Sequence, residues 1–524
     1  MNRQSDTNPL DVAVLIAGAG PTGLTLACEL ARRGIACRII DQADTYSAGS
    51  RGKGLQPRTQ EVFDDLGVID RVLAAGRPYP LIRAYDGEKV VWERYMHEHR
   101  EPTPDVPYPN VLMIPQLRTE KILRDRLAEY AVHVELATAL IGFEQDAEGV
   151  TATLSHAGET GQVRAAYLVG ADGGHSIVRK TLGVGFQGET FETQRMLIGD
   201  VGVDGLDRAH WHTWIDAERG TLKLGLCPLP GMDVFQFTAP ITTDTVPELS
   251  LAKYQQIVDE STGRSDIRLH DLSWISLYRV NIRMVDRYRV GRVFLAGDAA
   301  HVHSPAGGQG LNTGVQDAYN LGWKLGQVLM GAPEQLLDSY EEERLPIAAD
   351  VLGISTRLLN RSIRGDANAY QRGTETQQLG LDYRGSSLSR DERDALHAVA
   401  AGDRAPDAAC HDATGTPIRL FDIFRGPSFT LLAFGAGFTE IVPAINARYN
   451  GSVHAYAVVR SGQGAESAGI VDTDGYAHRA YGIGSDTLVL IRPDGYIGMI
   501  TQQRSAGVLN EYLSQVMTAQ PMLP

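Results

Sequence analysis

The stretch Val12-Ala13-Val14-Leu15-Ile16-Ala17, followed by Gly18-Ala19-Gly20-Pro21-Thr22-Gly23, decides the fold of this chain. Its apolar run predicts a buried strand, and the glycine-rich turn leads into a helix from Leu24 to Arg33. Gly18 suits the tight turn, Gly20 lets the backbone approach a pyrophosphate, and Gly23 lets the helix pack on the strand. A second strand from Ile35 to Ile40 ends at Asp41, eighteen residues after Gly23, where an acid can bind ribose hydroxyls. This order of elements predicts a dinucleotide site with the phosphates at the helix N-terminus.

Composition bounds the class of protein. The chain has 524 residues of ordinary globular composition, which suggests about two to four domains. A formal net charge of −15 argues against nucleic-acid and anionic-lipid partners. No apolar run is long enough to span a membrane. We expect no signal segment, because Met1 to Pro9 are polar and the apolar run after them is too short for one. We expect a soluble, cytoplasmic protein with no metal, whose scattered cysteines form neither a disulfide framework nor a zinc site: Cys28, Cys37, Cys227 and Cys410.

The pattern along the chain predicts three parts. An α/β part includes the basic loop Ser50 to Leu55 and helices near 57–66 and 117–130. Between about Phe191 and Leu277, short alternating segments predict an antiparallel sheet inserted into the α/β part. The predicted strands of that sheet are Met196 to Val203, Trp211 to Ile215, Thr221 to Leu226, Val234 to Ala239 and Trp274 to Val280. The α/β pattern returns at Arg292 and gives way, after a polar connector from Arg361 to Ala401, to a compact C-terminal pattern.

Two further motifs accompany the N-terminal glycine turn. One is the run Gly170-Ala171-Asp172-Gly173 through Arg179, which follows an apolar strand. The other is Gly297-Asp298-Ala299-Ala300-His301 through Ser304-Pro305-Ala306-Gly307-Gly308-Gln309-Gly310-Leu311-Asn312. With these three stretches in order, the sequence from about Val12 to Arg344 resembles the class A flavoprotein monooxygenases, the single-component aromatic hydroxylases. In that family the stretches are the FAD fingerprint, the DG motif and the GD motif.

The resemblance implies bound FAD and a site for it. Asp298 would accept a ribityl hydroxyl, the helix from Leu311 would aim its positive end at the flavin N1/C2 edge, and Pro305 would stand beside the ring. Gln116 would lie near the ribityl chain. Arg51 would lie near the flavin or pyrophosphate, or would be a solvated loop charge. The expected cofactor-binding residues are Gly18, Gly20, Pro21, Thr22, Gly23, Asp41, Gln42, Arg51, Gln116, Asp172, Asp298, Pro305, Gly308, Gly310, Leu311 and Asn312.

The DG motif leaves two interpretations open. Asp172 and Arg179 could form an internal ion pair that fixes a turn, or Asp172 could serve FAD and reduced nicotinamide. No second glycine fingerprint is present for NADPH or NADH. The resemblance therefore implies transient docking of the nicotinamide over the FAD-binding domain.

The C-terminal part also resembles the phenol-hydroxylase-type members of the family. Gly402 to Pro406, Ile418 to Asp422 and Leu490 to Ile497 look like their thioredoxin-like tail, without a C-x-x-C motif and with Cys410 alone. We expect an α/β fold with a Rossmann-like, glutathione-reductase-type FAD-binding domain, an inserted antiparallel substrate sheet and a C-terminal thioredoxin-like domain that supports structure or a homodimer. The expected boundaries are 1–190 with 281–400, 191–280, and 401–524, and strands near 76–115 join the substrate wall.

The inserted sheet supplies candidates for an aromatic pocket: Trp211, His212, Trp214, Phe235, Phe237 and Tyr278. His212 and Trp214 share one face, and Trp211 and Thr213 share the other, but alternation alone leaves open which face looks inward. The pocket candidates retained are His212, Trp214, Phe237 and Pro305, with no catalytic base assigned. For His301 and His303 we expect structural hydrogen bonds.

The resemblance implies an FAD-dependent, NAD(P)H-consuming monooxygenase that uses O2 to hydroxylate a phenolic or polycyclic aromatic compound through a flavin C4a-hydroperoxide. An antibiotic or polyketide tailoring enzyme and a xenobiotic-modifying enzyme both fit. Baeyer–Villiger oxygen insertion and a non-catalytic flavin-binding module remain alternatives. Flavin-dependent halogenation is disfavoured because Trp211-His212-Thr213-Trp214 does not match a W-x-W-x-I-P element. A plain NAD dehydrogenase is disfavoured by the GD motif.

Overall fold

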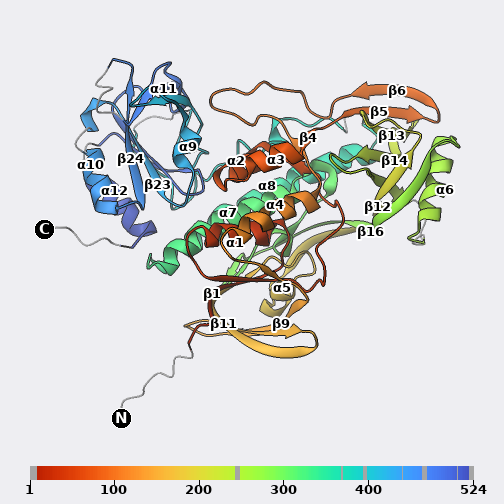
Figure 1. Cartoon of the computed structure of the whole chain (residues 1–524), viewed down its shortest axis with the longest axis horizontal. Helices are drawn as coiled ribbons and strands as arrows, with labels where there is room; N and C mark the ends of the chain where they lie inside the picture. The colour runs from red at the N-terminus through yellow and green to blue at the C-terminus, as the bar shows by residue number, and fades with distance from the viewer. Residues whose placement is uncertain are drawn as a thin grey trace, which may run out of the picture.

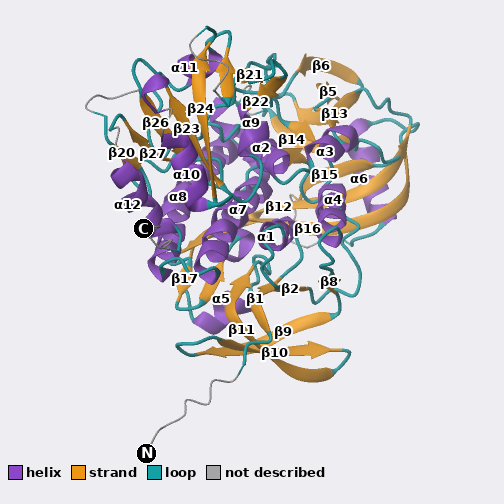
Figure 2. Ribbon diagram, turned by 60° about the vertical axis from the view of Figure 1, so that its left-hand side comes forward, coloured by secondary structure: helices purple, strands orange, loops and turns teal. Residues whose placement is uncertain are grey.

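The computed structural model describes residues 9–241, 248–366, 370–393, 398–438, 441–462, 469–503 and 506–518. Three eight-stranded sheets and a small three-stranded sheet organise the described chain. Figure 1 shows the first sheet at the bottom, the second at the right beside α6, and the third at the upper left. Figure 2 shows the same strands with the helices gathered between the sheets. The mixed α/β class predicted from the sequence is confirmed.

The first sheet is built around the predicted N-terminal strand, β1 (Val12–Ala17), which pairs in parallel with β2 and β11. The strand order is β17-β18-β11-β1-β2-β8, and β9 and β10 extend β11 as an antiparallel meander. The other strands are β2 (Cys37–Ile40), β8 (Val134–Glu135), β9 (Thr138–Gln145), β10 (Val150–His156), β11 (Glu159–Gly170), β17 (Arg289–Val290) and β18 (Val293–Leu295).

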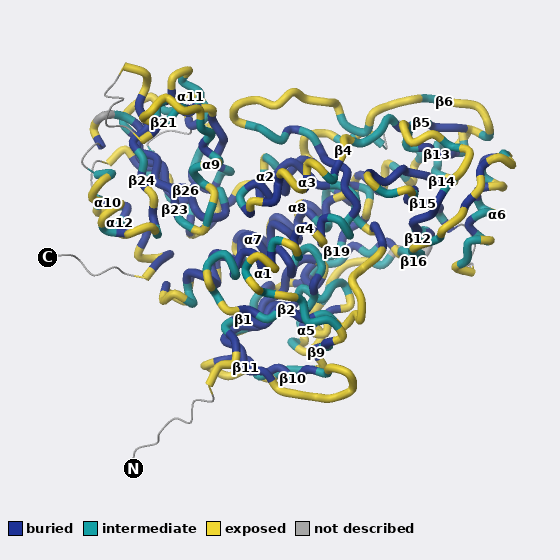
Figure 3. Tube along the Cα trace, viewed as in Figure 1, coloured by how far each residue is buried: buried dark blue, intermediate teal, exposed yellow. Residues whose placement is uncertain are grey.

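Helices cover this sheet and form the centre of the molecule. Figure 1 shows α1, α4 and α7 stacked between the first sheet and the pair α2 and α3, and Figure 3 shows that α1 and α7 are largely buried there. Their apolar residues share one core with β1 and β11. The helices are α1 (Pro21–Ala31), α2 (Pro57–Asp65), α3 (Ile69–Ala75), α4 (Gln116–Ala128), α5 (Ile177–Leu182), α7 (Gly310–Leu329) and α8 (Asp338–Ile363). The small sheet comprises β3 (Gly54–Leu55), β4 (Arg77–Pro78) and β7 (Leu112–Met113).

The second sheet contains every strand predicted for the inserted region and has the order β19-β16-β12-β15-β14-β13-β5-β6. Helix α6 (Leu251–Thr262) begins at Ser250, whose hydroxyl accepts from Lys253 N, and ends at Gly263 in the left-handed region. The strands are β5 (Leu81–Asp86), β6 (Lys89–Arg94), β12 (Phe186–Asp204), β13 (His210–Asp216), β14 (Thr221–Pro228), β15 (Phe235–Ile241), β16 (Arg268–Val285) and β19 (His301–Val302).

Strands β12 and β16 connect the first two layers. They pair from Phe186 opposite Val285 to Asp204 opposite Arg268, so one ladder runs from the end of α5 to the far end of the second sheet. The expected boundaries at 190 and 281 therefore fall inside these two strands. The ladder fixes the second sheet directly onto the first domain.

The third sheet forms the C-terminal part, with the order β20-β27-β26-β23-β24-β25-β21-β22. It already includes residues 390 and 391, ahead of the expected boundary at 401. The thioredoxin-like character of this part remains a prediction. Its elements are β20 (Arg390–Asp391), β21 (Ala409–Asp412), β22 (Pro417–Arg419), β23 (Phe429–Phe434), β24 (Val453–Arg460), β25 (Ile470–Asp472), β26 (Thr487–Ile491), β27 (Ile497–Thr501), α9 (Leu420–Phe424), α10 (Ile441–Tyr449), α11 (Tyr476–Ala480) and α12 (Ala506–Val516).

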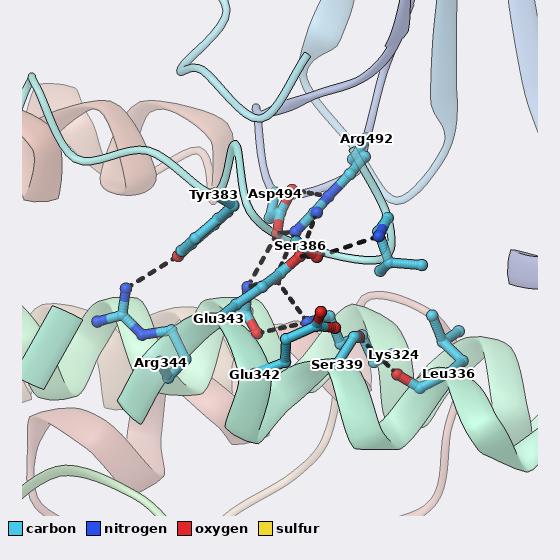
Figure 4. A network of polar contacts seen from close by, with 12 residues as sticks. Lys324, Leu336, Ser339, Glu342, Glu343, Arg344, Tyr383, Ser386, Arg492 and Asp494 are labelled. Carbon is cyan, nitrogen blue, oxygen red and sulfur yellow. Dashed lines mark hydrogen bonds and ion pairs between the residues drawn. The ribbon is translucent and has the colours of Figure 1, made fainter. Parts of the chain in front are cut away.

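This C-terminal part is joined to α7 and α8 by both apolar and charged contacts. Trp323 of α7 packs edge-on against Phe429 of β23, with ring centroids 5.7 Å apart. Beside it, Arg492, Glu343 and Lys324 form a fully buried cluster, which Figure 4 shows between the helices and the C-terminal chain. The junction is therefore part of the protein core.

Candidate cofactor and substrate site

The three glycines of the N-terminal turn have different environments. Gly18 has φ +103°, and a Cβ there would lie 2.3 Å from the Ala171 carbonyl oxygen. A Cβ on Gly23 would lie 2.0 Å from the Gly18 oxygen, because α1 packs tightly on the turn. A Cβ on Gly20, by contrast, would have no neighbouring atom within 4 Å. Gly18 and Gly23 thus serve packing, whereas Gly20 leaves the space beside the turn open for a diphosphate.

The predicted acid Asp41 follows β2 and closes the same turn. One carboxylate oxygen accepts from the Ala19 N–H at 2.8 Å, and the other accepts from the Ala43 N–H at 2.9 Å. Each oxygen retains acceptor capacity, so the fixed carboxylate can also receive ribose hydroxyls. Gln42, beside it, is exposed.

Pro21 and Thr22 begin α1. Pro21 stands in the first turn of the helix, where its missing N–H costs no hydrogen bond. The Thr22 side chain occupies the space between Gly297 and Gly314, where a Cβ on either glycine would come within 2.5 Å of its hydroxyl. Thr22 therefore joins the N-terminal turn to the GD motif and α7.

Asp298 lies in a single helical turn, Gly297–Ala299, just after β18, and faces the N-terminus of α7. Its carboxylate is open to solvent but flanked by protein, and this desolvation raises its pKa, while His301 and Arg51 oppose the rise. A Cβ on Gly310, the first residue of α7, would lie 3.9 Å from its oxygen. No side chain caps α7, so the positive N-terminus and its first N–H groups, at Gly310, Leu311 and Asn312, remain available to a ligand.

Asn312 joins this helix to the loop that precedes α2. Its amide oxygen accepts from Gln56 N at 2.8 Å, and its amide nitrogen donates to Gly54 O and Gly308 O, each at 2.9 Å. Asn312 therefore positions two loops. Gly308, with φ +62°, is exposed beside Pro305. Its backbone atoms are therefore accessible to a ligand at this edge of the site.

Gln116 at the start of α4 fixes the other end of the basic loop. Its side-chain oxygen accepts from Gly52 N at 3.0 Å, and its nitrogen donates to Glu120 at 2.8 Å. Gln116 thus acts on the loop that carries Arg51. Arg51 itself is exposed and lies 5.9 Å from the centroid of Trp274, on β16.

The anchor of this loop in the second sheet has no signature in the sequence. Buried Asp200 of β12 accepts from both the hydroxyl and the N–H of Ser50, at 2.5 and 2.8 Å. Gln236 of β15 donates to the Ser50 carbonyl. Loop 49–55 is therefore held between the first domain and the second sheet, with Arg51 at its exposed edge.

In the DG motif, the described residues do not form the internal ion pair, and the role of Asp172 toward FAD and reduced nicotinamide stays a prediction. Asp172 accepts from Ile177 N at 2.7 Å and Val178 N at 3.3 Å, so its carboxylate stabilises the start of α5. Among the described residues, Arg179 does not pair with Asp172 and instead donates to Gly174 O at 2.7 Å and Ala299 O at 2.8 Å. Arg179 thereby ties the DG motif to the GD motif.

His301 and His303 form a buried chain beneath the GD loop. His301 contacts Asp317 at 2.7 Å through Nε2 and His303 at 2.8 Å through Nδ1. Asp317 also accepts from Arg344 Nε at 2.7 Å. Burial, and secondly the nearby His301, hold the pKa of His303 far below its usual range, so His303 is neutral.

The second sheet has two different faces, and helix α6 identifies the outer one. Phe237 lies 4.2 Å from Tyr254 of α6, centroid to centroid, and Trp214 belongs to the same apolar cluster. His212 stacks on Tyr85 beside Trp214, and its Nδ1 contacts the Tyr85 hydroxyl at 2.9 Å. We therefore correct the pocket prediction: His212, Trp214 and Phe237 are packing residues on the face away from the first sheet and its helices.

The opposite face looks toward the dinucleotide fold. Cys227 contacts Met113 of β7, and Tyr278 donates to the His303 carbonyl at 3.1 Å. Tyr278 and Ala306, the neighbour of exposed Pro305, both pack against the apolar cluster of Val280, Ile282 and Leu359. By alternation Trp211 and Thr213 lie on this face, whereas His212 lies on the opposite one.

Comparison with known proteins agrees with this geometry. Residues 11–355 match the family described as FAD binding domain, and residues 398–519 match aromatic-ring hydroxylase, C-terminal. A flavin-dependent monooxygenase of Mycobacteroides abscessus is 49% identical, over 96% of this chain and 100% of that protein. The 6-methylpretetramide 4-monooxygenase of Streptomyces rimosus is 34% identical, over 95% and 92%.

A solved structure shows the same arrangement. The ternary complex of aklavinone-11 hydroxylase with FAD and aklavinone superposes with a TM-score of 0.82 at 28% identity, covering 97% of this chain and 99% of that one. Within the described residues, no helix is both long and apolar enough to cross a membrane. The open glycine turn, the uncapped α7 and the accessible Asp298 fit FAD. The chain therefore belongs to the family of FAD-dependent aromatic-ring monooxygenases.

Proposed function

We propose that this protein is an NAD(P)H-consuming monooxygenase that uses O2 to hydroxylate a phenolic or polycyclic aromatic compound. The observation that supports this most is the meeting of Gly20, Asp298 and the α7 N-terminus beside a sheet face that has its own polar and aromatic side chains. Bound FAD, once reduced by the nicotinamide, would supply the oxygen-activating chemistry. The relatives that act on polycyclic compounds favour a tailoring or xenobiotic-modifying role.

The residues of this chain have separate tasks in that reaction. Gly20 and Asp41 would hold the adenosine diphosphate half, and Asp298 with the N-terminus of α7 would hold the ribityl chain and the flavin N1/C2 edge. The positive end of α7 would stabilise negative charge at that edge. Pro305 and the face containing Tyr278 would keep water away from the reacting side of the ring.

The test is oxidation of NADPH and NADH by the FAD-loaded protein across a panel of phenols and polycyclic quinones. Hydrogen peroxide and product mass are followed together. We expect an aromatic compound to accelerate nicotinamide oxidation and to gain one oxygen atom. Ring expansion to an ester or lactone would identify Baeyer–Villiger insertion instead. If the protein binds flavin but neither nicotinamide reduces it and no aromatic compound changes its behaviour, the result would favour a non-catalytic flavin-binding module.

A further inference from the structure

The inner face of the second sheet contains a flat floor. Thr213 of β13, Gly225 of β14 and Thr238 of β15 lie directly opposite one another across three strands. A Cβ on Gly225 would lie 2.6 Å from the Thr238 hydroxyl and 3.5 Å from the Trp211 indole nitrogen. Glycine here allows the indole of Trp211 to lie close over the sheet, next to the Thr238 hydroxyl.

Two polar atoms on this floor have no partner within the described protein. The Trp211 indole N–H and the Thr213 hydroxyl are both buried and make no hydrogen bond, and Thr213 is only 1% exposed. Buried donors are nearly always satisfied, because an unsatisfied one costs about 1–3 kcal/mol. Two such atoms on the face that meets the cofactor site are donors left for a ligand to satisfy.

A cation lies above the same floor. The Lys53 ammonium is 4.1 Å from the centroid of Trp211, and no described carboxylate forms an ion pair with it. Burial raises the pKa of nearby Asp200, whose hydrogen bonds go to Ser50, and Lys53 is among the groups that oppose that rise. The described partners of Lys53 are the Cys227 thiol and the Trp211 ring. Neither neutralises the Lys53 charge, which can therefore meet a ligand anion.

Aromatic groups border the cation. Tyr79 lies 6.3 Å from Trp211 and from His97, centroid to centroid. Burial, and then the Arg372 guanidinium, lower the pKa of His97 to about 4, so His97 is neutral at neutral pH. The site thus combines flat apolar walls, neutral donors and a positive potential.

We propose that Lys53, Trp211, Thr213 and Thr238 form a recognition site for the phenolic oxygens of a planar aromatic substrate. The Lys53 ammonium stabilises an ionised phenol or enol, and the Trp211 N–H and Thr213 hydroxyl donate to the neighbouring oxygens. This inference rests on the proposed function and adds the groups that select the substrate: acidic, oxygen-rich rings over their alkylated or unsubstituted counterparts.

The test uses FAD-loaded protein and matched probe pairs, each a phenol with its methyl ether. The pairs are 1,8-dihydroxyanthraquinone, 1-naphthol and pentachlorophenol with the corresponding ethers. Binding is measured from the change in flavin absorbance, and turnover from NADPH oxidation. The variants are Lys53→Met and Thr213→Val, and Lys253→Met on the outer face of α6 is the matched lysine control.

We expect wild-type protein to bind the phenols about tenfold or more tightly than the ethers. Lys53→Met should abolish most of this preference and leave ether binding and the flavin spectrum unchanged. Thr213→Val should weaken phenol binding without lowering the melting temperature, because the hydroxyl has no partner in the protein to lose. Lys253→Met should match wild type.

The possible outcomes distinguish failure of the recognition site from failure of the proposed monooxygenase function. The recognition site would be refuted if phenols bound no better than their ethers, or if Lys53→Met kept the preference for phenols. Turnover of either probe would in that case still support the proposed monooxygenase function. If no member of any pair perturbs the flavin or accelerates NADPH oxidation, both proposals fail. A lower melting temperature for Thr213→Val would show that its hydroxyl is structural.

Discussion

Arg492 of the C-terminal part forms a two-pronged ion pair with Glu343 of α8, at 2.6 and 2.9 Å, and both side chains are completely buried. Lys324 of α7 contacts the same carboxylate at 2.7 Å, and Asp494 accepts from Arg492. The strong opposing charges hold the pKa of Glu343 well below its usual range, against the effect of burial. The next residue along α8, Arg344, binds Asp317 beneath the GD loop, so adjacent residues face the C-terminal part and the cofactor site.

We expect Arg492→Met to lower the free energy of unfolding by about 3–5 kcal/mol, because Glu343 and Asp494 lose their main buried counter-charge. Urea denaturation measures the change. Arg71→Met is the matched control, since the Arg71–Glu129 pair is about 40% exposed on both sides, and it should change stability by no more than about 1 kcal/mol. Equal effects of the two variants would contradict the assigned role of the buried pair.

Gly20→Ala should weaken FAD binding, whereas Gly18→Ala should weaken the fold. Ala fits the extended backbone of Gly20 (φ −74°) and meets no protein atom, so the FAD-free protein should keep its melting temperature. The Kd for FAD should rise about tenfold or more, a loss of about 1.4 kcal/mol or more. Gly18→Ala should lower the free energy of unfolding by about 2 kcal/mol or more, because φ +103° and the Ala171 carbonyl both oppose a side chain.

Calorimetry of the FAD-free variants and fluorescence titration with FAD separate these effects. Unchanged FAD binding by a folded Gly20→Ala protein would show that the pyrophosphate lies elsewhere.

Asp200→Ala should weaken FAD binding about tenfold, since Ser50 loses two hydrogen bonds and loop 49–55 is no longer fixed beside the site. The Kd for FAD is the measurement. Asp204→Ala lies on the same strand and exposes its side chain to solvent, so it should bind FAD like wild type. If Asp200→Ala bound FAD as tightly as wild type, loop 49–55 would not contribute to FAD binding.

Asp407 should make the C-terminal part sensitive to pH. Burial raises the pKa of its carboxyl to about 7, from an ordinary value near 3.8. Because the folded-state pKa is the higher one, the contribution to stability is complete below about pH 4 and is lost as the pH rises toward 7. Asp407→Asn should flatten the decline in free energy of unfolding between these pH values.

Urea unfolding at several pH values measures that slope. Asp412→Asn on β21 provides a contrast, because hydrogen bonds from Thr414 and from the backbone lower the pKa of Asp412. Its contribution is present at higher pH and is lost as the pH falls through the acidic range. An unchanged slope for Asp407→Asn would place the titrating group elsewhere.

The local elements of the cofactor site follow from the sequence because their determinants are neighbours in the chain. The run from Val12 to Gly23 specifies its own strand, turn and helix, and the predicted strands near Trp211 and Phe235 appear with nearly the expected ends. The helix expected near Leu311 begins at Gly310. Periodicity and glycine positions determine such elements directly.

The inward face of the second sheet could not be predicted in the same way. Alternation along β13 separates Trp211 from His212 but is symmetrical with respect to the two faces. The packing of α6 against Trp214 and Phe237 on one face, and the contact of Cys227 with Met113 on the other, resolve it. Likewise, Ser50 meets Asp200 across 150 positions and Glu343 meets Arg492 across 149, and no local pattern marks either pair.

The shared ladder of β12 and β16 has a mechanical consequence. A hinge between two domains needs a short segment whose backbone can rotate without breaking many hydrogen bonds. Here β12 and β16, two of the connections, are strands paired with each other through the junction, from Phe186 and Val285 outward. Rotation of the second sheet against the first would therefore have to break this ladder, so we expect a bulky ring to be admitted by local changes in loops and not by a hinge between the two sheets.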